Sequence, residues 1–137
     1  MRYLLDTNAC VGLINQRPAV LRTRFDRALA GGGEMFVSAV AAFELWYGVA
    51  NSSRQEANAR RVETFLAGPL AVLPFEKEDA SNAGRIRTTL QAAGKFLGAY
   101  DVLVAGQAIR HKMTLVTANA REFGRVSWLA WEDWSKS

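Results

Sequence analysis

The chain has 137 residues, of which 50% are hydrophobic and 22% charged. This composition is typical of a globular protein, and we expect one domain over residues 1–137. The single cysteine, Cys10, excludes an intramolecular disulfide and a zinc site built on several thiolates. The apolar runs are too short to cross a bilayer, and the N-terminus lacks signal-peptide features, so we expect a cytoplasmic protein without membrane contact.

The balance of charge is mildly basic. There are 17 Lys and Arg residues against 13 Asp and Glu residues, a formal net charge of +4. A basic domain favours a polyanionic partner such as nucleic acid. The signal is not specific, because many basic proteins bind no nucleic acid.

Short apolar runs alternate with amphipathic segments along the chain. We expect strands at residues 2–6, 35–37, 70–73 and 114–117, and an edge strand at 128–131. Helices are expected from residue 7, at 18–29, 39–50, 54–67, 77–93 and 101–109, with a turn or short helix at 119–123. This alternation predicts an α/β fold with a mostly parallel sheet of four to five strands, flanked by helices in three layers.

Three acids lie in the most apolar parts of the sequence. Asp6 ends the first expected strand, Glu44 is the only charge in residues 39–50, and Asp101 is the only charge in residues 96–106. An ionised carboxylate in such surroundings is costly unless a helix N-terminus, a basic side chain or a metal ion compensates it. Sites of open parallel sheets form beyond the carboxyl ends of the strands. We therefore expect Asp6, Glu44, Asp101 and Asn119, which follows the fourth strand, at one edge of the sheet.

Clustered carboxylates repel one another and favour a bound cation. Oxygen ligands without a His or Cys partner suit Mg²⁺ or Mn²⁺ rather than zinc. Such an ion activates water and stabilises charge on a leaving oxygen. The reaction class that fits this chemistry is phosphodiester hydrolysis.

Each acid also has a plainer interpretation. Asp6 would serve as a helix N-cap, and Asp101 would complement the positive end of its helix. Glu44 would form a structural ion pair with Arg85 or Arg87.

Other polar residues extend the candidate site. Asn119 is either part of the cluster or a turn residue, and Glu122 is either a further acid of the site or a solvated charge. Lys95 and Arg87, close in sequence to Asp101, are candidates for contacts with RNA phosphates. His111 fits a charge at a helix C-terminus better than a general base.

Four motifs carry a family resemblance: LLDTN at residues 4–8, FELWYG at 43–48, GAYDVLVA at 98–105 and TLVTANAREF at 114–123. Together with the tail at 128–134, they resemble the PIN-domain ribonucleases, specifically the VapC toxins of type II toxin–antitoxin modules. The resemblance implies a PIN-like fold, RNA cleavage that depends on a divalent metal, and a homodimer. It also implies a higher hetero-oligomer with a cognate VapB-type antitoxin, through which alone DNA would be bound.

By motif position, the resemblance implies that Asp6, Glu44 and Asp101 bind the metal. Asn119 occupies the fourth position, with Thr117 and Glu122 beside it, and Asn8 would support the site by hydrogen bonding. Two residues depart from the pattern, Ala99 where many relatives have Pro and Ala118 where close relatives often have Asn.

Neither departure removes an acid, so we expect an active Mg²⁺-dependent endoribonuclease, with a tRNA among the candidate substrates. The alternatives are a non-catalytic module that binds RNA or protein, and a nuclease directed at DNA.

Overall fold

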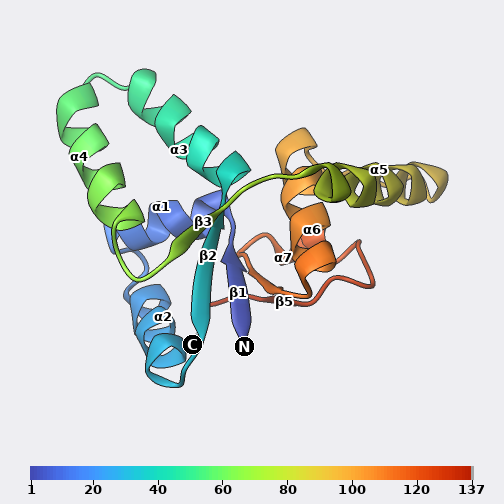
Figure 1. Ribbon diagram of the computed structural model, residues 1–137, viewed down its shortest axis with the longest axis horizontal. Helices are drawn as coiled ribbons and strands as arrows, with labels where there is room; N and C mark the ends of the chain where they lie inside the picture. Colours follow the sequence, from blue (N-terminus) through green and yellow to red (C-terminus); the bar gives the residue numbers. More distant parts are fainter. Residues whose placement is uncertain (137) are drawn as a thin grey trace.

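The computed structural model describes residues 1–136 and is built on one parallel sheet (Figure 1). Its strand order is β3-β2-β1-β4-β5, and each pair of neighbours is parallel. The strands are β1 Arg2–Leu5, β2 Glu34–Ser38, β3 Ala71–Leu73, β4 Thr114–Val116 and β5 Trp131–Glu132. The predicted α/β class and the parallel sheet of four to five strands are confirmed.

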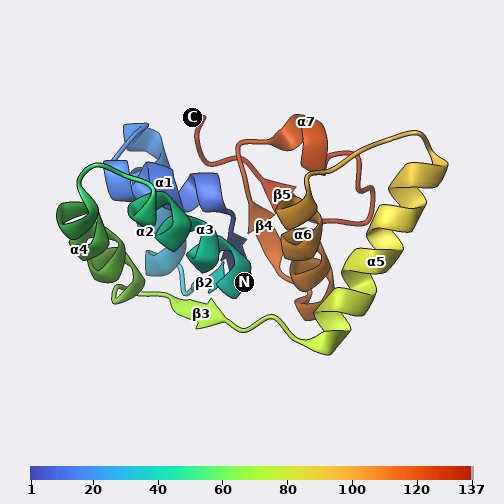
Figure 2. The same cartoon turned by 90° about the horizontal axis from the view of Figure 1, so that it is seen from above.

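Helices cover both faces of this sheet, as Figure 2 shows. On one side lie α1 Thr7–Asn15, α2 Ala19–Ala30, α3 Ala39–Ala50 and α4 Gln55–Leu66. On the other side lie α5 Lys77–Ala92, α6 Ala99–His111 and α7 Ala120–Phe123. None of the helices in residues 1–136 is long and apolar enough to cross a membrane.

Two hydrophobic cores result from this layering, one on each face of the sheet. Consecutive strand residues point to opposite faces. Leu4 accordingly packs into the core beneath α5 and α6, while Leu5 packs into the core beneath α1 to α4, and both are 0% exposed. The central strand β1 is therefore buried on both sides, and its carboxyl end opens directly onto the edge of the sheet.

The last strand is shorter than the edge strand that we expected at residues 128–131, and it begins later. β5 is limited to Trp131–Glu132, because the preceding segment forms turns that bury Val126 and Leu129 in the core. The apolar character of this segment therefore reflects core packing rather than strand pairing. The predicted domain over 1–137 extends one residue beyond the part of the chain that the structure describes.

Helices α5 and α6 approach each other closely at Gly106. A Cβ atom on Gly106 would lie 2.8 Å from the Ala83 backbone nitrogen and 2.9 Å from the Asp79 carbonyl oxygen. Such distances leave no room for a methyl group. The absence of a side chain at this position thus sets the spacing of the two helices.

We expect Gly106→Ala to lower the free energy of unfolding by about 1–3 kcal/mol, because the added methyl group must displace backbone atoms of α5. Gly84→Ala is the matched control on α5, since an added Cβ atom there meets nothing within 4 Å. Alanine is the better helix former, so the control should gain about 0.5–1 kcal/mol. Urea denaturation measures both, and equal effects of the two substitutions would contradict the close approach.

Candidate active site

Asp6 lies directly after β1 and is only 5% exposed. Its Oδ1 accepts a hydrogen bond of 2.7 Å from the Ala9 backbone N–H, so Asp6 is the N-cap of α1. Burial raises the pKa of the Asp6 carboxyl, while hydrogen bonds from Thr117 and from the Ala9 backbone partly offset this effect. The plainer N-cap interpretation is therefore correct, but it does not account for the neighbouring charges.

Glu44 reaches the same edge from the second turn of α3, whose N-terminus is capped by Ser38. The Thr7 hydroxyl donates a hydrogen bond of 2.7 Å to Glu44 Oε1. The alternative of a structural ion pair with Arg85 or Arg87 is wrong, since no such pair occurs in residues 1–136. Thr7 instead fixes the Glu44 carboxylate beside the start of α1.

Asp101 lies in the first turn of α6. Its carboxylate folds back over the N-cap residue, where a Cβ atom on Gly98 would be 3.1 Å from Asp101 Oδ2. Burial, followed by the negative charges of Asp6, Glu44 and Glu122, raises the pKa of Asp101 to about 6. The topology agrees with these contributions, because Asp6, Glu44 and Asp101 follow the carboxyl ends of strands or begin helices at the same edge of the parallel sheet.

Asn119 and Glu122 lie at the same edge of the sheet, at the start of α7. The Asn119 backbone N–H donates to Thr117 Oγ1 at 2.9 Å, and its side-chain amide donates to Glu122 Oε2 at 3.0 Å. Asn119 is thus a turn residue that also holds an acid. Glu122 is close enough to Asp101 to affect its pKa, so it is not simply a solvated charge.

The structure separates some predicted residues from this cluster and adds others. Asn8 is exposed, and its side chain forms no hydrogen bond within residues 1–136; the supporting hydrogen bond comes from Thr7. The negative charge of Asp133 also raises the pKa of Asp6. The sequence alone indicated no role for Thr7 or Asp133. Thr7 nevertheless lies in the motif at residues 4–8, and Asp133 lies in the C-terminal tail at 128–134.

Within the described part of the chain, no basic side chain pairs with the acids of this cluster. Across residues 1–136, none of the carboxylates of Asp6, Glu44, Asp101 and Glu122 forms an ion pair with Lys, Arg or His. Every side chain that could coordinate an ion here offers oxygen, which is the ligand that hard divalent cations such as Mg²⁺ and Mn²⁺ prefer. The donor set therefore fits a divalent metal ion.

Comparison with known proteins places this geometry in a family. A family model described as the PIN domain matches residues 3–129. The tRNA(fMet)-specific endonuclease VapC of Shigella flexneri is 37% identical over 135 residues, which cover 98% of this chain and 99% of the relative. Ribonuclease VapC2 of Haemophilus influenzae is 35% identical over 98% of each chain. The chain belongs to the VapC family of PIN-domain ribonucleases.

Solved VapC structures share the fold. The VapBC2 complex of Rickettsia felis, bound to a promoter DNA fragment, contains a chain with a TM-score of 0.91 and 34% identity, covering 98% of this chain and 99% of that one. The DNA-bound VapBC complex of Salmonella typhimurium gives a TM-score of 0.89 and 35% identity over 98% of each chain. The resemblance seen in the four sequence motifs is thus confirmed at the level of family and fold.

Ala99, which stands where many relatives have proline, lies at the start of a helix. Ala99 is the first residue of α6, directly after the Gly98 N-cap. Proline is favoured at this position because its missing N–H is not needed in the first turn. Alanine also forms helix well, and α6 begins at Ala99, two residues before Asp101.

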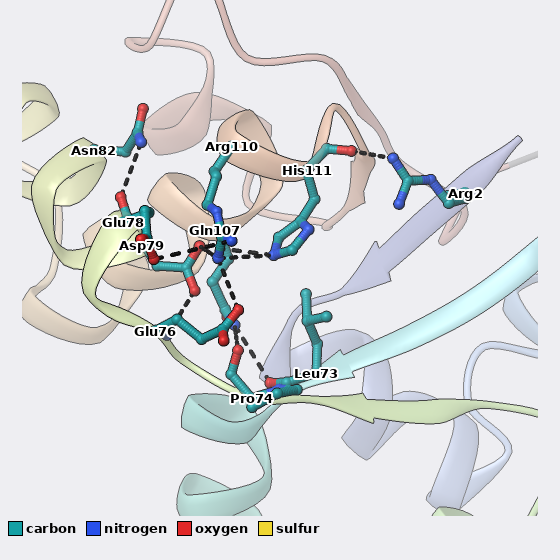
Figure 3. A network of polar contacts seen from close by, with 10 residues as sticks. All are labelled: Arg2, Leu73, Pro74, Glu76, Glu78, Asp79, Asn82, Gln107, Arg110 and His111. Atoms are coloured by element: carbon teal, nitrogen blue, oxygen red, sulfur yellow. Dashed lines mark hydrogen bonds and ion pairs between the residues drawn. The ribbon is translucent and has the colours of Figure 1, made fainter.

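A second group of acids lies at the other end of α6 (Figure 3). Glu76, Asp79 and His111 each place one ligand atom within 4.8 Å of the others, a spacing that a metal ion could use. Arg110 already lies among these acids, with Nη1 at 3.0 Å from Glu76 Oε1 and 3.3 Å from Asp79 Oδ1. The buried Asp79 also accepts a hydrogen bond of 2.7 Å from the Glu76 backbone N–H. We therefore interpret this group as a polar connection between α5 and α6.

We expect the ion-free protein to lose stability as the pH rises from about 4 to about 6, because Asp101 ionises more easily in the unfolded chain than in the folded one. Above the folded pKa of about 6, this contribution stays constant. Glu44→Gln should lower the pKa of Asp101 and weaken this pH dependence. Carboxyl NMR titration combined with denaturation at several pH values measures both quantities.

Glu63→Gln is the control for net charge, because Glu63 is exposed on α4 and forms no ion pair within residues 1–136. It should leave the Asp101 titration unchanged. An ordinary Asp pKa for Asp101 in the ion-free wild type would contradict the convergence of the acids.

Proposed function

We propose that this chain is the toxin of a VapBC-type toxin–antitoxin pair and cleaves RNA with the help of a Mg²⁺ or Mn²⁺ ion. In this proposal Asp6, Glu44 and Asp101 are the metal ligands, directly or through water. The observation that carries it is the group of acids at one edge of the sheet, none of which forms an ion pair within residues 1–136. Burial, together with the charges of Asp6, Glu44 and Glu122, raises the pKa of Asp101 to about 6. A divalent cation relieves this repulsion.

Such an ion, when bound, supplies a Lewis acid that activates water and stabilises charge on the phosphate. The chain supplies the positioning. Thr7 orients Glu44, while Thr117 and the Ala9 N–H orient Asp6. Asn119 holds Glu122, and we assign these two residues to the orientation of water at the same edge.

Helix N-termini add to the attraction for a phosphate. Both α1 and α6 begin at this edge, immediately after Asp6 and two residues before Asp101. The N-terminal end of a helix carries a partial positive charge and unpaired N–H groups, which favour a phosphate group. The edge thus combines ligands for a cation with a favourable potential for the RNA backbone.

The named relatives support the choice of RNA and of the partner. One relative is named a tRNA(fMet)-specific endonuclease, so we propose a tRNA as the first substrate to test. The similar solved structures are VapBC complexes, two of them on DNA. For this chain we propose a VapB-type antitoxin as partner, with DNA bound only through it. The proposed site of action is the cytoplasm.

An exposed aromatic patch supports the proposed homodimer. Phe43 and Tyr47 on α3 lie beside Tyr100 on α6, with ring centroids of Phe43 and Tyr100 5.5 Å apart. All three are exposed, Tyr47 by 62%. Contiguous exposed aromatic surface is typical of a protein–protein interface. This patch adjoins Glu44, so a dimer built on it would place the two active sites near each other.

The first test is an RNA cleavage assay on tRNA with Mg²⁺ and with EDTA. Chelation of the metal should abolish cleavage, and Asp6→Asn should reduce the rate by at least about 100-fold, because removal of a ligand exceeds the usual cost of losing a supporting residue. Asp26→Asn is the control, since Asp26 is an exposed acid on α2 paired with Arg22 at 3.8 Å. Cleavage that survives both EDTA and Asp6→Asn would exclude the metal mechanism, and cleavage of single-stranded DNA in preference to RNA would favour the rival nuclease.

Expression of the chain alone should arrest bacterial growth, and coexpression of the small gene next to its own should restore growth. The reason is that RNA cleavage without an antitoxin stops protein synthesis. Growth curves with wild type and Asp6→Asn measure the effect. Equal arrest by both proteins would show that toxicity does not depend on the proposed chemistry.

A further inference from the structure

A hollow of about 140 Å³ lies between the C-terminal half of α5 and the start of α6. Leu90, Leu97 and Val102 contribute apolar side chains to its floor, and Arg87, Gln91, Lys95 and Phe96 also line it. The apolar residues belong to the core, whereas Phe96 is 71% exposed. The hollow thus has a fixed floor and a polar, aromatic rim.

The hollow adjoins the acidic edge through the backbone. Val102 lines it, and the preceding residue of α6 is Asp101. The segment that carries Lys95 and Phe96 continues to Gly98, over which the Asp101 carboxylate lies. A ligand in the hollow would therefore be a neighbour of the proposed reaction centre.

The loop that carries Lys95 and Phe96 is held in place. The Lys95 N–H donates to the Leu90 carbonyl at 2.8 Å, and the Arg125 guanidinium donates to the Phe96 carbonyl. Leu97 is buried and anchors the loop in the core. The rim is consequently positioned before any ligand binds, which lowers the entropic cost of binding.

The charged side chains that line the hollow are both basic, Arg87 and Lys95. Residues 80–100 contain Arg85, Arg87 and Lys95 and no acid. Neither Arg87 nor Lys95 forms an ion pair with another residue of the range 1–136. Unpaired basic side chains beside a metal-binding edge favour a phosphate group.

An exposed phenylalanine next to two cations is a typical arrangement for binding an unpaired nucleotide. The aromatic ring offers a face on which a base can stack, and the cations offer contacts with the adjoining phosphate. The three rim residues therefore match the two chemical parts of one nucleotide.

We propose that this hollow binds a nucleotide of the RNA next to the phosphate that is cleaved. Its base stacks on Phe96, and its phosphate lies between Arg87 and Lys95. This subsite rests on the proposed function. It requires an unpaired base at this position, because a base within a duplex cannot stack on a side chain.

The test is the affinity of a short fluorescent single-stranded RNA for the full chain, measured by anisotropy with Mg²⁺ in the slowly cleaving Asp6→Asn background. Phe96→Ala should weaken binding about ten-fold, and Phe96→Trp should restore it. Arg87→Gln should weaken binding by about three- to ten-fold and reduce the slope of log Kd against log salt by about one.

Arg85→Gln is the matched control, because Arg85 carries the same charge two residues earlier on α5 but does not line the hollow. It should change the affinity by less than about two-fold, as expected for a distant exposed charge at moderate salt. Equal losses of affinity for Arg85→Gln and Arg87→Gln would show that only the net positive charge of the chain matters, and this would overturn the subsite. Unchanged affinity with Phe96→Ala would also overturn it.

Two further readouts separate the subsite from other outcomes. In the otherwise wild-type chain, Phe96→Ala should raise KM for RNA and change kcat less. If it alters the oligomeric state and not the RNA affinity, the hollow is a protein contact and the proposal is wrong. If the wild type cleaves RNA but these variants keep its KM, only the subsite fails; if the wild type neither binds nor cleaves any RNA, the proposed function fails as well.

Discussion

Repulsion among carboxylates at one edge of the sheet is the constraint on which the rest of this structure depends. Each acid is brought there by a different element, at the end of β1, in α3, in α6 and in α7. Folding therefore brings together charges that would separate in the unfolded chain, and the two hydrophobic cores must supply the free energy for this. The pKa of Asp101 is raised to about 6 by burial and, after it, by the charges of Asp6, Glu44 and Glu122.

The surrounding hydrogen bonds restrict how the acids can relax. Thr7 fixes Glu44, the start of α1 fixes one oxygen of Asp6, and Asn119 fixes Glu122. Without these contacts the longer side chains could turn into solvent and relieve the repulsion. Neutral donors thus hold the negative charges in place without cancelling them, which is the preorganisation that the proposed cation site requires.

Much of this arrangement could be predicted from the sequence, because the decisive signals were local. Asp6, Glu44 and Asp101 stand out as single charges in apolar segments, and the alternation of strands and helices predicts the edge at which they meet. Contacts between distant segments gave no such signal. The hydrogen bond between Thr7 and Glu44, the effect of Asp133 on Asp6 and the approach of α5 to α6 at Gly106 all depend on tertiary packing. The edge strand was misplaced for a related reason, since Val126 and Leu129 are apolar for the core and not for a strand.

The position of Asp6 as the cap of α1 couples the integrity of the fold to the chemistry of the edge. An alanine at this position would remove both the acceptor for the Ala9 N–H and the charge. Loss of activity in such a variant would therefore not distinguish loss of the charge from loss of the fold. Asparagine keeps an oxygen acceptor and removes only the charge. If the proposed function holds, a change from Asp6 to asparagine is therefore the substitution that removes activity while it disturbs the fold least.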